Sequence, residues 1–371
     1  MNSSNQLTKE EIAVVGFSGR FPKSANTSEL WKNLEGGVDC ITNVPSSRWD
    51  HDKFCRDAEE QGYDIECKWG GFVNGVDEFD PHFFGMPPGV TALHDPNERL
   101  FLETVWNLFE SAGYPRKIIN SKYDAEVGLF LGLTRLEYHY FAANSFEKAA
   151  MSGLSHGAVA NRVSHFFNLK GPSVAIDTLC SSSLTAINSA CQSLLKGDCK
   201  LAVAGGTNLS VHPSKYLLLT QGQMLGSSPD NRSFGQGNGY FPSEAVGAVL
   251  LKRLSDAERD GDTIHAVIKA SNAAHGGATN WLFVPNQSAI SELIGKTLSD
   301  AEVSSKSIGY VEVSANGSQI ADKAEIDALS RTFKRETDEV GICPVGTVKS
   351  NIGHPEAASG ICQLIKVILQ L

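Results

Sequence analysis

Short apolar runs alternate with amphipathic stretches along the 371 residues of the chain. Continuous apolar runs of four to eight residues are typical of buried strands, and apolar positions at three- and four-residue spacing are typical of helices. We predict strands at 11–16, 126–132, 173–177, 201–204, 245–251, 264–270, 308–313 and 344–348. We predict helices at 28–34, 95–112, 184–197, 288–301, 322–333 and 356–369. This alternation predicts an α/β fold with helices layered on mostly buried sheets.

The clearest helix is 95–112. Asp95 can cap its N-terminus, Pro96 suits its first turn and Gly113 follows its end. One apolar stripe runs along it, formed by Leu102, Val105, Trp106 and Phe109. A charged stretch at 255–262 interrupts the pattern, so we divide the chain into two halves, 1–255 and 256–371. The polar stretch 51–65 is interpreted as a surface insertion.

Composition excludes several classes of function. A formal net charge of −10 argues against nucleic-acid binding, which normally requires a basic surface. The longest apolar runs fall short of the ~20 residues that a membrane-spanning helix needs, and the polar residues 1–6 do not resemble a secretory signal. The eight cysteines include no C-x-x-C pair, so we expect no metal site and reduced thiols, and from these a cytoplasmic location.

Cys180 is the exception among these thiols. It lies where the predicted strand 173–177 turns into a largely apolar helix. Backbone N–H groups and the helix dipole at such a start stabilise a thiolate, and the same N–H groups can bind the oxyanion that forms on a thioester under attack. Cys180 is therefore a candidate nucleophile for acyl transfer, and an ordinary buried cysteine is the alternative.

The segments around this cysteine and around His354 resemble the signatures of ketosynthases. Residues 177–184 read DTLCSSSL, similar to D-T-A-C-S-S-S-L, and 349–358 read KSNIGHPEAA, similar to K-S-N-I-G-H-T-E-A-A. Further segments fit in the same order along the chain: IAVVG at 12–16, RFP at 20–22, DPNERL at 95–100, AGG at 204–206 and GYFPSEAVGAVL at 239–250. His212-Pro213, Tyr216 and Gln221-Gly222 are similar to ketosynthases of modular polyketide synthases that use a free-standing acyltransferase.

The resemblance implies a thiolase-like fold, in which two related halves stack as α-β-α-β-α layers and two chains form a homodimer. It implies that Cys180 accepts an acyl chain from the phosphopantetheine arm of an acyl carrier protein, and that the domain binds no cofactor of its own. It also implies that His354 stabilises an enolate beside the thioester, and that Lys349 pairs with Glu356 and braces the site. Neighbouring polyketide synthase domains are further expected partners.

The resemblance breaks at a second histidine. Ketosynthases carry E-A-H-G-T-G-T, whereas residues 310–322 here read YVEVSANGSQIAD, which places Ser314 at the histidine. Asn316 and Ser318 replace two threonines that contact the pantetheine arm in the family. A serine cannot act as an acid or a cation at neutral pH, and losing a placed catalytic group costs ~10²–10⁴ in rate. We therefore expect acyl transfer without decarboxylative elongation. His275 is the only other histidine we consider as a substitute, and a weak one.

Two other functions stay open. The chain could be an active condensing ketosynthase that tolerates Ser314, or a catalytically silent scaffold or dimer partner. An unrelated hydrolase is disfavoured because no G-x-S-x-G or G-x-C-x-G elbow frames the nucleophile. The resemblance also places a last family segment, with a Gly-rich F-G-F-G-G turn, beyond residue 371, so we expect a truncated second sheet. Candidates to line an acyl pocket, equally compatible with the core, are Met224, Phe234 and Trp281.

Overall fold

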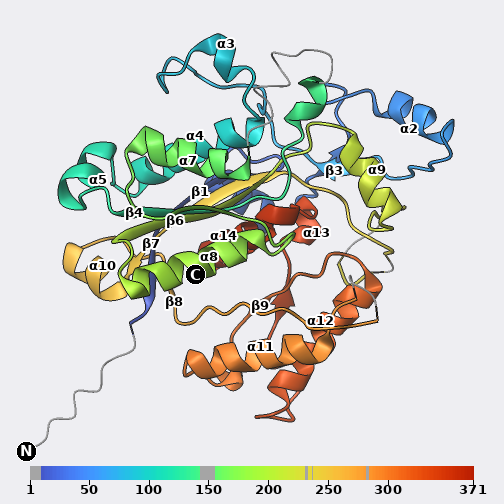
Figure 1. Cartoon of the computed structure of the whole chain (residues 1–371). Helices are drawn as coiled ribbons and strands as arrows, with labels where there is room; N and C mark the ends of the chain where they lie inside the picture. Colours follow the sequence, from blue (N-terminus) through green and yellow to red (C-terminus); the bar gives the residue numbers. More distant parts are fainter. Residues whose placement is uncertain (1–9, 143–154, 230–232, 236, 281–283) are drawn as a thin grey trace, which may run out of the picture.

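The structure is a computed structural model that describes residues 10–142, 155–229, 233–235, 237–280 and 284–371 (Figure 1). Its strands are β1 (Ile12–Arg20), β2 (Ile41–Asn43), β3 (Trp69–Gly71), β4 (Val127–Gly132), β5 (Ser173–Ile176), β6 (Leu201–Asn208), β7 (Ala245–Arg253), β8 (Ala266–Ile268), β9 (Val311–Glu312) and β10 (Val345–Gly346). The helices of the first 260 residues are α1 (Thr27–Glu35), α2 (His51–Glu59), α3 (Pro88–Thr91), α4 (Pro96–Ser111), α5 (Arg116–Lys122), α7 (His156–Phe167), α8 (Ser182–Lys196), α9 (Ser214–Gln221) and α10 (Leu254–Asp260). The later helices are α11 (Gln287–Asp300), α12 (Gln319–Phe333), α13 (Lys349–Ile352) and α14 (Ser359–Gln370), and a 3-10 turn, η3 (Glu356–Ala358), precedes α14.

A six-stranded mixed sheet forms the centre, in the order β5-β4-β6-β7-β1-β8. The strands β5, β4 and β6 run parallel, and β7 runs antiparallel to both β6 and β1. Both faces of the sheet are buried under apolar clusters. Successive side chains of a strand point to opposite faces, so each strand contributes to both clusters. On β1, for example, Ala13 and Val15 join one apolar cluster, whereas Ile12 and Val14 join the other.

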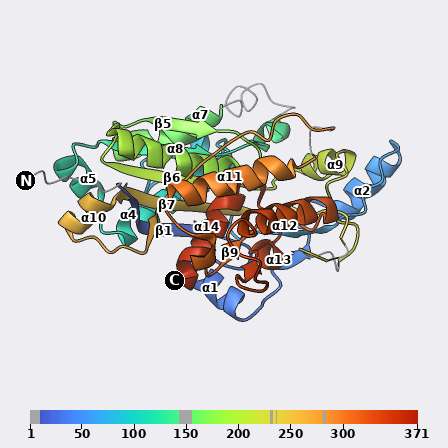
Figure 2. The same ribbon diagram turned by 90° about the horizontal axis from the view of Figure 1, so that it is seen from below.

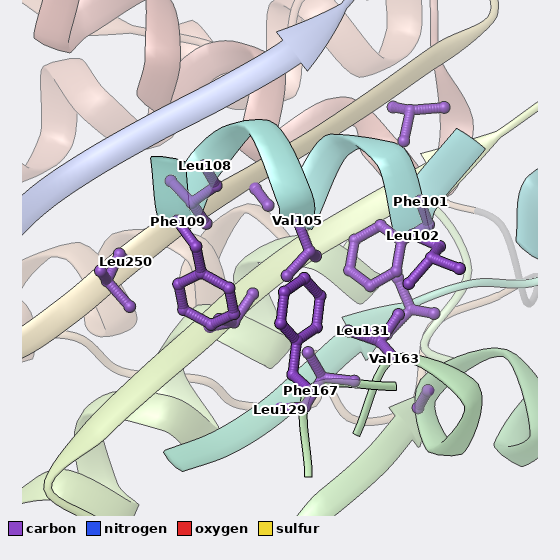
Figure 3. Packing of buried hydrophobic residues seen from close by; sticks show 14 of the residues in the cluster. Phe101, Leu102, Val105, Leu108, Phe109, Leu129, Leu131, Val163, Phe167 and Leu250 are labelled. Atoms are coloured by element: carbon purple, nitrogen blue, oxygen red, sulfur yellow. The ribbon is translucent and has the colours of Figure 1, made fainter. Parts of the chain in front are cut away.

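Helices α4 and α7 cover one face of this sheet. The apolar side of α4 packs onto β1 and β7, and Phe167 of α7 packs edge-on against Phe109 of α4 with ring centroids 4.9 Å apart (Figure 3). As predicted, Asp95 caps α4 by accepting a hydrogen bond from Asn97 N, and Pro96 lies in its first turn. Three of the four predicted stripe residues are buried, and Trp106 is half-buried.

Helices α8 and α14 cover the opposite face, and the second half of the chain continues beyond them. Gln363 of α14 donates a hydrogen bond to Val313 O, next to β9, so α14 lies between the large sheet and the small one (Figure 1). Among the described residues that small sheet has two parallel strands, β10 and β9, and α11 and α12 form the outermost layer (Figure 2). The α/β architecture with two stacked sheets is therefore as predicted.

The structure adds to or shortens the predicted elements at three places. The charged stretch at 255–262 is mostly a helix, α10, in which Asp256 binds both Arg253 and Arg259 at three-residue spacing. The polar insertion at 51–65 contains α2, which Asp50 caps. The small-sheet strands are also shorter than predicted, because pairing between β9 and β10 is confined to two residues of each strand.

Candidate active site

Cys180 lies in the tight turn that joins β5 to α8. The turn is closed by side chains: Thr178 N donates to Ser182 Oγ at 2.9 Å, and Leu179 N donates to Asp177 Oδ1 at 3.0 Å. Leu179 adopts a φ of +56°, a strained conformation for a branched side chain that the surrounding bonds must maintain. The strand-turn-helix prediction therefore places Cys180 correctly, immediately before the first turn of α8.

Glycines let the start of α8 approach its neighbours closely. A Cβ on Gly132 of β4 would lie 2.4 Å from Ser183 N, and a Cβ on Gly360 of α14 would lie 2.2 Å from Leu184 Cγ. In addition, Ser183 Oγ accepts a hydrogen bond from Ile361 N. The helix that follows the cysteine is thereby locked to both the sheet and the helix that follows His354.

Burial raises the pKa of the Cys180 thiol to about 11. The Glu356 carboxylate raises it further, whereas Lys349, the backbone N–H of Cys180 itself and Arg135 lower it. Much of the residue is exposed at the surface of the single chain, but its sulfur is surrounded by protein atoms, and that local environment determines the ionisation. The expectation of a thiolate stabilised at rest was wrong, because desolvation and a nearby carboxylate outweigh the helix start.

His354 is buried in the second signature segment, with 3% of its surface exposed. Its backbone is held by Phe241 O, which accepts from His354 N, and by Ser243 N, which donates to His354 O. Its Nδ1 accepts a hydrogen bond from Glu356 N at 3.0 Å, and Ser359 Oγ lies 3.0 Å from the same nitrogen. Since a backbone N–H can only donate, the ring proton must be on Nε2. Burial, with the charge of Lys349, lowers the pKa of His354 well below its usual value, so His354 is a neutral hydrogen-bond donor.

The loop that carries Ser314 is shaped by two carboxylates of α12. Glu325 accepts from Ser314 N at 2.7 Å and from Ala315 N at 2.9 Å, and Asp322 accepts from Gly317 N and from Phe234 N. The side chain of Ser314 is exposed and accepts a hydrogen bond from Lys349 Nζ at 2.8 Å.

Lys349 therefore has a different partner from the one expected. We predicted a Lys349–Glu356 ion pair, but the Glu356 carboxylate lies 3.7 Å from Nζ of the fully buried Lys215, which comes from α9. Glu356 has a φ of +40° at the turn before α14, and Lys215 occupies the space beside it. The expected pair was wrong, and Glu356 instead acts on the site through its backbone N–H and its charge.

A small cavity of about 20 Å³ joins these segments, which is room for about one water molecule. Its lining residues are Ile41, Ser233, Tyr240, Phe241, Asn316, Lys349, Ser350, Gly353 and His354. The ring centroids of Tyr240 and His354 are 4.5 Å apart. Polar groups from segments far apart in the sequence thus converge beside the histidine.

Two family models match the chain. "Beta-ketoacyl synthase, N-terminal domain" covers residues 9–257, and "Beta-ketoacyl synthase, C-terminal domain" covers residues 265–371. The chain belongs to the beta-ketoacyl synthase family. The ketosynthase resemblance seen in its signature segments is therefore confirmed.

Individual relatives come from polyketide synthases. The chain is 46% identical to polyketide synthase PksL of Bacillus subtilis over 98% of its length, and 43% identical to polyketide synthase ThaG of Burkholderia thailandensis over 98%. It spans only 8% and 6% of those two proteins. Among solved structures, it matches an oxazolomycin ketosynthase domain of Streptomyces albus, OzmH KS7, with a TM-score of 0.90 and 44% identity, covering 98% of this chain and 63% of that one. The ketosynthase from module 6 of the bacillaene synthase of Bacillus subtilis matches with a TM-score of 0.89 and 37% identity, covering 97% and 61%.

The other predicted residues of this ketosynthase lie around the cavity or away from it. Asn316 lines the cavity, although its Oδ1 also accepts from Ser318 N at 3.0 Å, and Ser318 is half-buried at the start of α12. His275 is exposed, and its Nδ1 accepts a hydrogen bond from Gly277 N. Met224 and Phe234 do not line the cavity, and Trp281 lies outside the described residues.

Sequence reasoning missed the role of Tyr240, Glu325 and Lys215. Tyr240 belongs to a segment used only to support the resemblance, and Glu325 served only to fix the register. Within the described ranges, no group of three or more His, Cys, Asp or Glu side chains could hold a metal ion. No described helix is both long and apolar enough to span a membrane.

Proposed function

We propose that this ketosynthase takes an acyl chain from an acyl carrier protein onto Cys180 and passes it to another carrier without elongating it. The observation that carries the proposal is the hydroxyl of Ser314, held by Lys349, at the position of the second histidine of the resemblance. Cys180 and His354 are both present, as transfer requires.

The two reactions need different groups. Transfer between thioesters needs a nucleophile, a donor to the oxyanion and a route for one proton. Decarboxylative condensation must additionally stabilise an enolate, and His354 offers a single Nε2–H for that purpose. Ser314 supplies a neutral hydroxyl in place of a second imidazole, so we expect elongation to fall by ~10²–10⁴.

The partners follow from the same proposal. The phosphopantetheine arm of the carrier is a substrate, with Asn316 and Ser318 near its path and no cofactor bound by the domain itself. Flanking domains of a modular polyketide synthase, of the type that uses a free-standing acyltransferase, are the expected context.

A homodimer is supported by the edge of the large sheet. The outer side of β5 has no strand on it in the described part of the chain. Exposed apolar residues surround this edge: Val174 is 40% exposed, Leu179 55% and Leu184 47%. An open edge with apolar side chains is a surface that a second copy would cover.

The test loads Cys180 with a short acyl thioester and adds either malonyl-charged or uncharged carrier protein, read by intact mass. We expect the acyl group on the uncharged carrier and no ketoacyl product two carbons longer on the malonyl carrier. Ser314→His is the matched variant, since it returns an imidazole to the loop and should raise the condensation product. A longer product from the wild type would instead support an active condensing enzyme, and no transfer at all would support a scaffold.

A further inference from the structure

A second cavity, of about 290 Å³, lies between the start of α4 and the loops that follow β3 and β6. Two arginines from distant parts of the sequence line it: Arg48, from the loop between β2 and α2, and Arg99, from the start of α4. We call it the arginine cavity. It shares no lining residue with the cavity beside His354. Its volume is close to the lower end of the ~300–1,000 Å³ that is usual for small-molecule sites.

Arg99 is a buried guanidinium without a partner in the described part of the chain. Only 7% of the residue is exposed, its Nε is buried and donates no hydrogen bond, and no described carboxylate lies within 4 Å of it. Each other charged side chain of the described ranges with such an unbonded buried atom lies within 4 Å of a group of opposite charge. Buried polar groups are normally satisfied, so the exception indicates a missing ligand.

The three carboxylates nearest to Arg99 in the sequence are bound elsewhere. Asp95 caps α4 and also accepts a hydrogen bond from Tyr138 N at 3.1 Å. Glu98 and Glu103 each pair with another arginine. The positive charge of Arg99 is therefore left without a paired carboxylate at the wall of the arginine cavity.

Arg48 is held firmly on the other side. Its Nη2 donates to the Glu244 carboxylate at 2.8 Å and to Val73 O at 2.7 Å. Glu244 also accepts from Val73 N and from Ser210 N, so this pair is fixed to two loops. Because Glu244 neutralises Arg48, the net positive charge at the cavity comes from Arg99.

Aromatic rings flank both guanidinium groups. Arg99 Cζ lies 5.9 Å from the ring centroid of Tyr138, and Arg48 Cζ lies 6.0 Å from that of Phe72. A ring over the face of a guanidinium leaves its N–H edge for a planar acceptor, and a carboxylate matches that edge with two parallel hydrogen bonds. The acidic residue of the lining, Asp77, is exposed, and it disfavours a doubly charged ligand such as a phosphate.

We propose that the arginine cavity binds a small carboxylate with an aromatic or branched apolar body. The carboxylate pairs with the N–H groups of Arg99, and the apolar body lies among Phe72, Tyr138 and Phe141. This inference goes beyond the proposed function and does not depend on it, because none of the lining residues belongs to the segments of Cys180 or His354.

The test is calorimetric titration of the whole chain with benzoate, and with benzamide as the uncharged molecule of the same shape. We expect benzoate to bind about 10- to 100-fold more tightly, because a hydrogen bond to a charged group contributes that much more than a neutral one. Phenylphosphonate, which adds negative charge, should bind more weakly than benzoate. Equal binding of benzoate and benzamide, or no binding of benzoate, would overturn the proposal, and tighter binding of phenylphosphonate would refute the carboxylate assignment.

Two variants place the ligand. Arg99→Gln should weaken benzoate binding by about 10- to 100-fold and should unfold in urea at no lower a concentration than wild type, because Arg99 forms no hydrogen bond within the described ranges. Arg56→Gln is the matched control: it removes the same charge from an exposed position in α2 that does not line the cavity, and it should bind benzoate within about twofold of wild type. Unchanged binding by folded Arg99→Gln, or equal weakening by both variants, would show that Arg99 does not hold the carboxylate. If Arg99→Gln did not fold, the comparison of benzoate with benzamide on the wild type would still decide.

Discussion

Gly132, the last residue of β4, determines how closely α8 begins to the sheet and therefore where Cys180 lies. A Cβ at this position would be 2.4 Å from Ser183 N, 2.6 Å from Ser182 C and 2.7 Å from Ser183 Cα. All three are backbone atoms, so no rotation of a side chain can relieve the contacts. In Gly132→Ala the start of α8 must move by about 1 Å, the difference between 2.4 Å and the 3.4 Å of ordinary contact. We expect Cys180 acylation to fall ~10²-fold and unfolding free energy to fall by about 1–3 kcal/mol.

The measurement pairs urea unfolding with the rate at which an acyl thioester loads Cys180. Gly128→Ala, in the same strand, is the matched control, because its Cβ would meet the side chains of Phe130 at 2.8 Å and Cys199 at 3.1 Å, which can shift. It should lose comparable stability and still acylate at close to the wild-type rate. If folded Gly132→Ala were acylated as fast as the control, the sheet would not position the nucleophile, and the argument would fail.

Two predictions concern ionisation. In the unloaded protein, alkylation of Cys180 by iodoacetamide, followed by peptide mass, should keep rising with pH toward a midpoint near 11, because burial favours the neutral thiol; a plateau below about pH 8 would contradict the assigned environment. Desolvation, together with the charges of Arg162 and Arg99, lowers the pKa of the buried His94 to about 4. The folded state therefore favours the neutral imidazole, and the stability that this residue contributes is lost as the pH falls below the pKa that His94 has in the unfolded chain. Between about pH 7.5 and pH 5, wild type should lose roughly 2 kcal/mol more unfolding free energy than His94→Gln, and equal losses in urea titrations would count against this.

The elements that the sequence predicted best have both an apolar period and end signals. Helix α4 combines an apolar stripe with its Asp95 cap, and α8 ends at Gly197, whose φ of +80° needs a glycine. Helix α10 was missed because its order depends on arginine–aspartate pairs rather than on an apolar face. Periodicity detects burial, and a short helix that lies mostly at the surface leaves little of that signal.

The candidate site also contains residues that the sequence could assign and contacts that it could not. Cys180 and His354 could be assigned because each is embedded in a contiguous signature. The partner of Lys349 could not, since Ser314 is 35 residues away and Glu356 only seven, and the choice between them depends on how α9 and α12 pack. The raised pKa of Cys180 could not be predicted for a similar reason: the helix start is visible in the sequence, whereas the desolvation of the sulfur depends on the tertiary packing.

The loop around Ser314 is held in place through its backbone, so its conformation does not depend on the side chain of residue 314. Every hydrogen bond that Glu325 and Asp322 accept from this loop comes from a backbone N–H, at Ser314, Ala315 and Gly317. None depends on which side chain residue 314 carries. The bond that does depend on it is the one from Lys349, which lies on the side of the cavity and His354. A substitution at 314 should therefore alter hydrogen bonding beside the cavity while α12 keeps the backbone of the loop in place, so residue 314 can vary without loss of the fold.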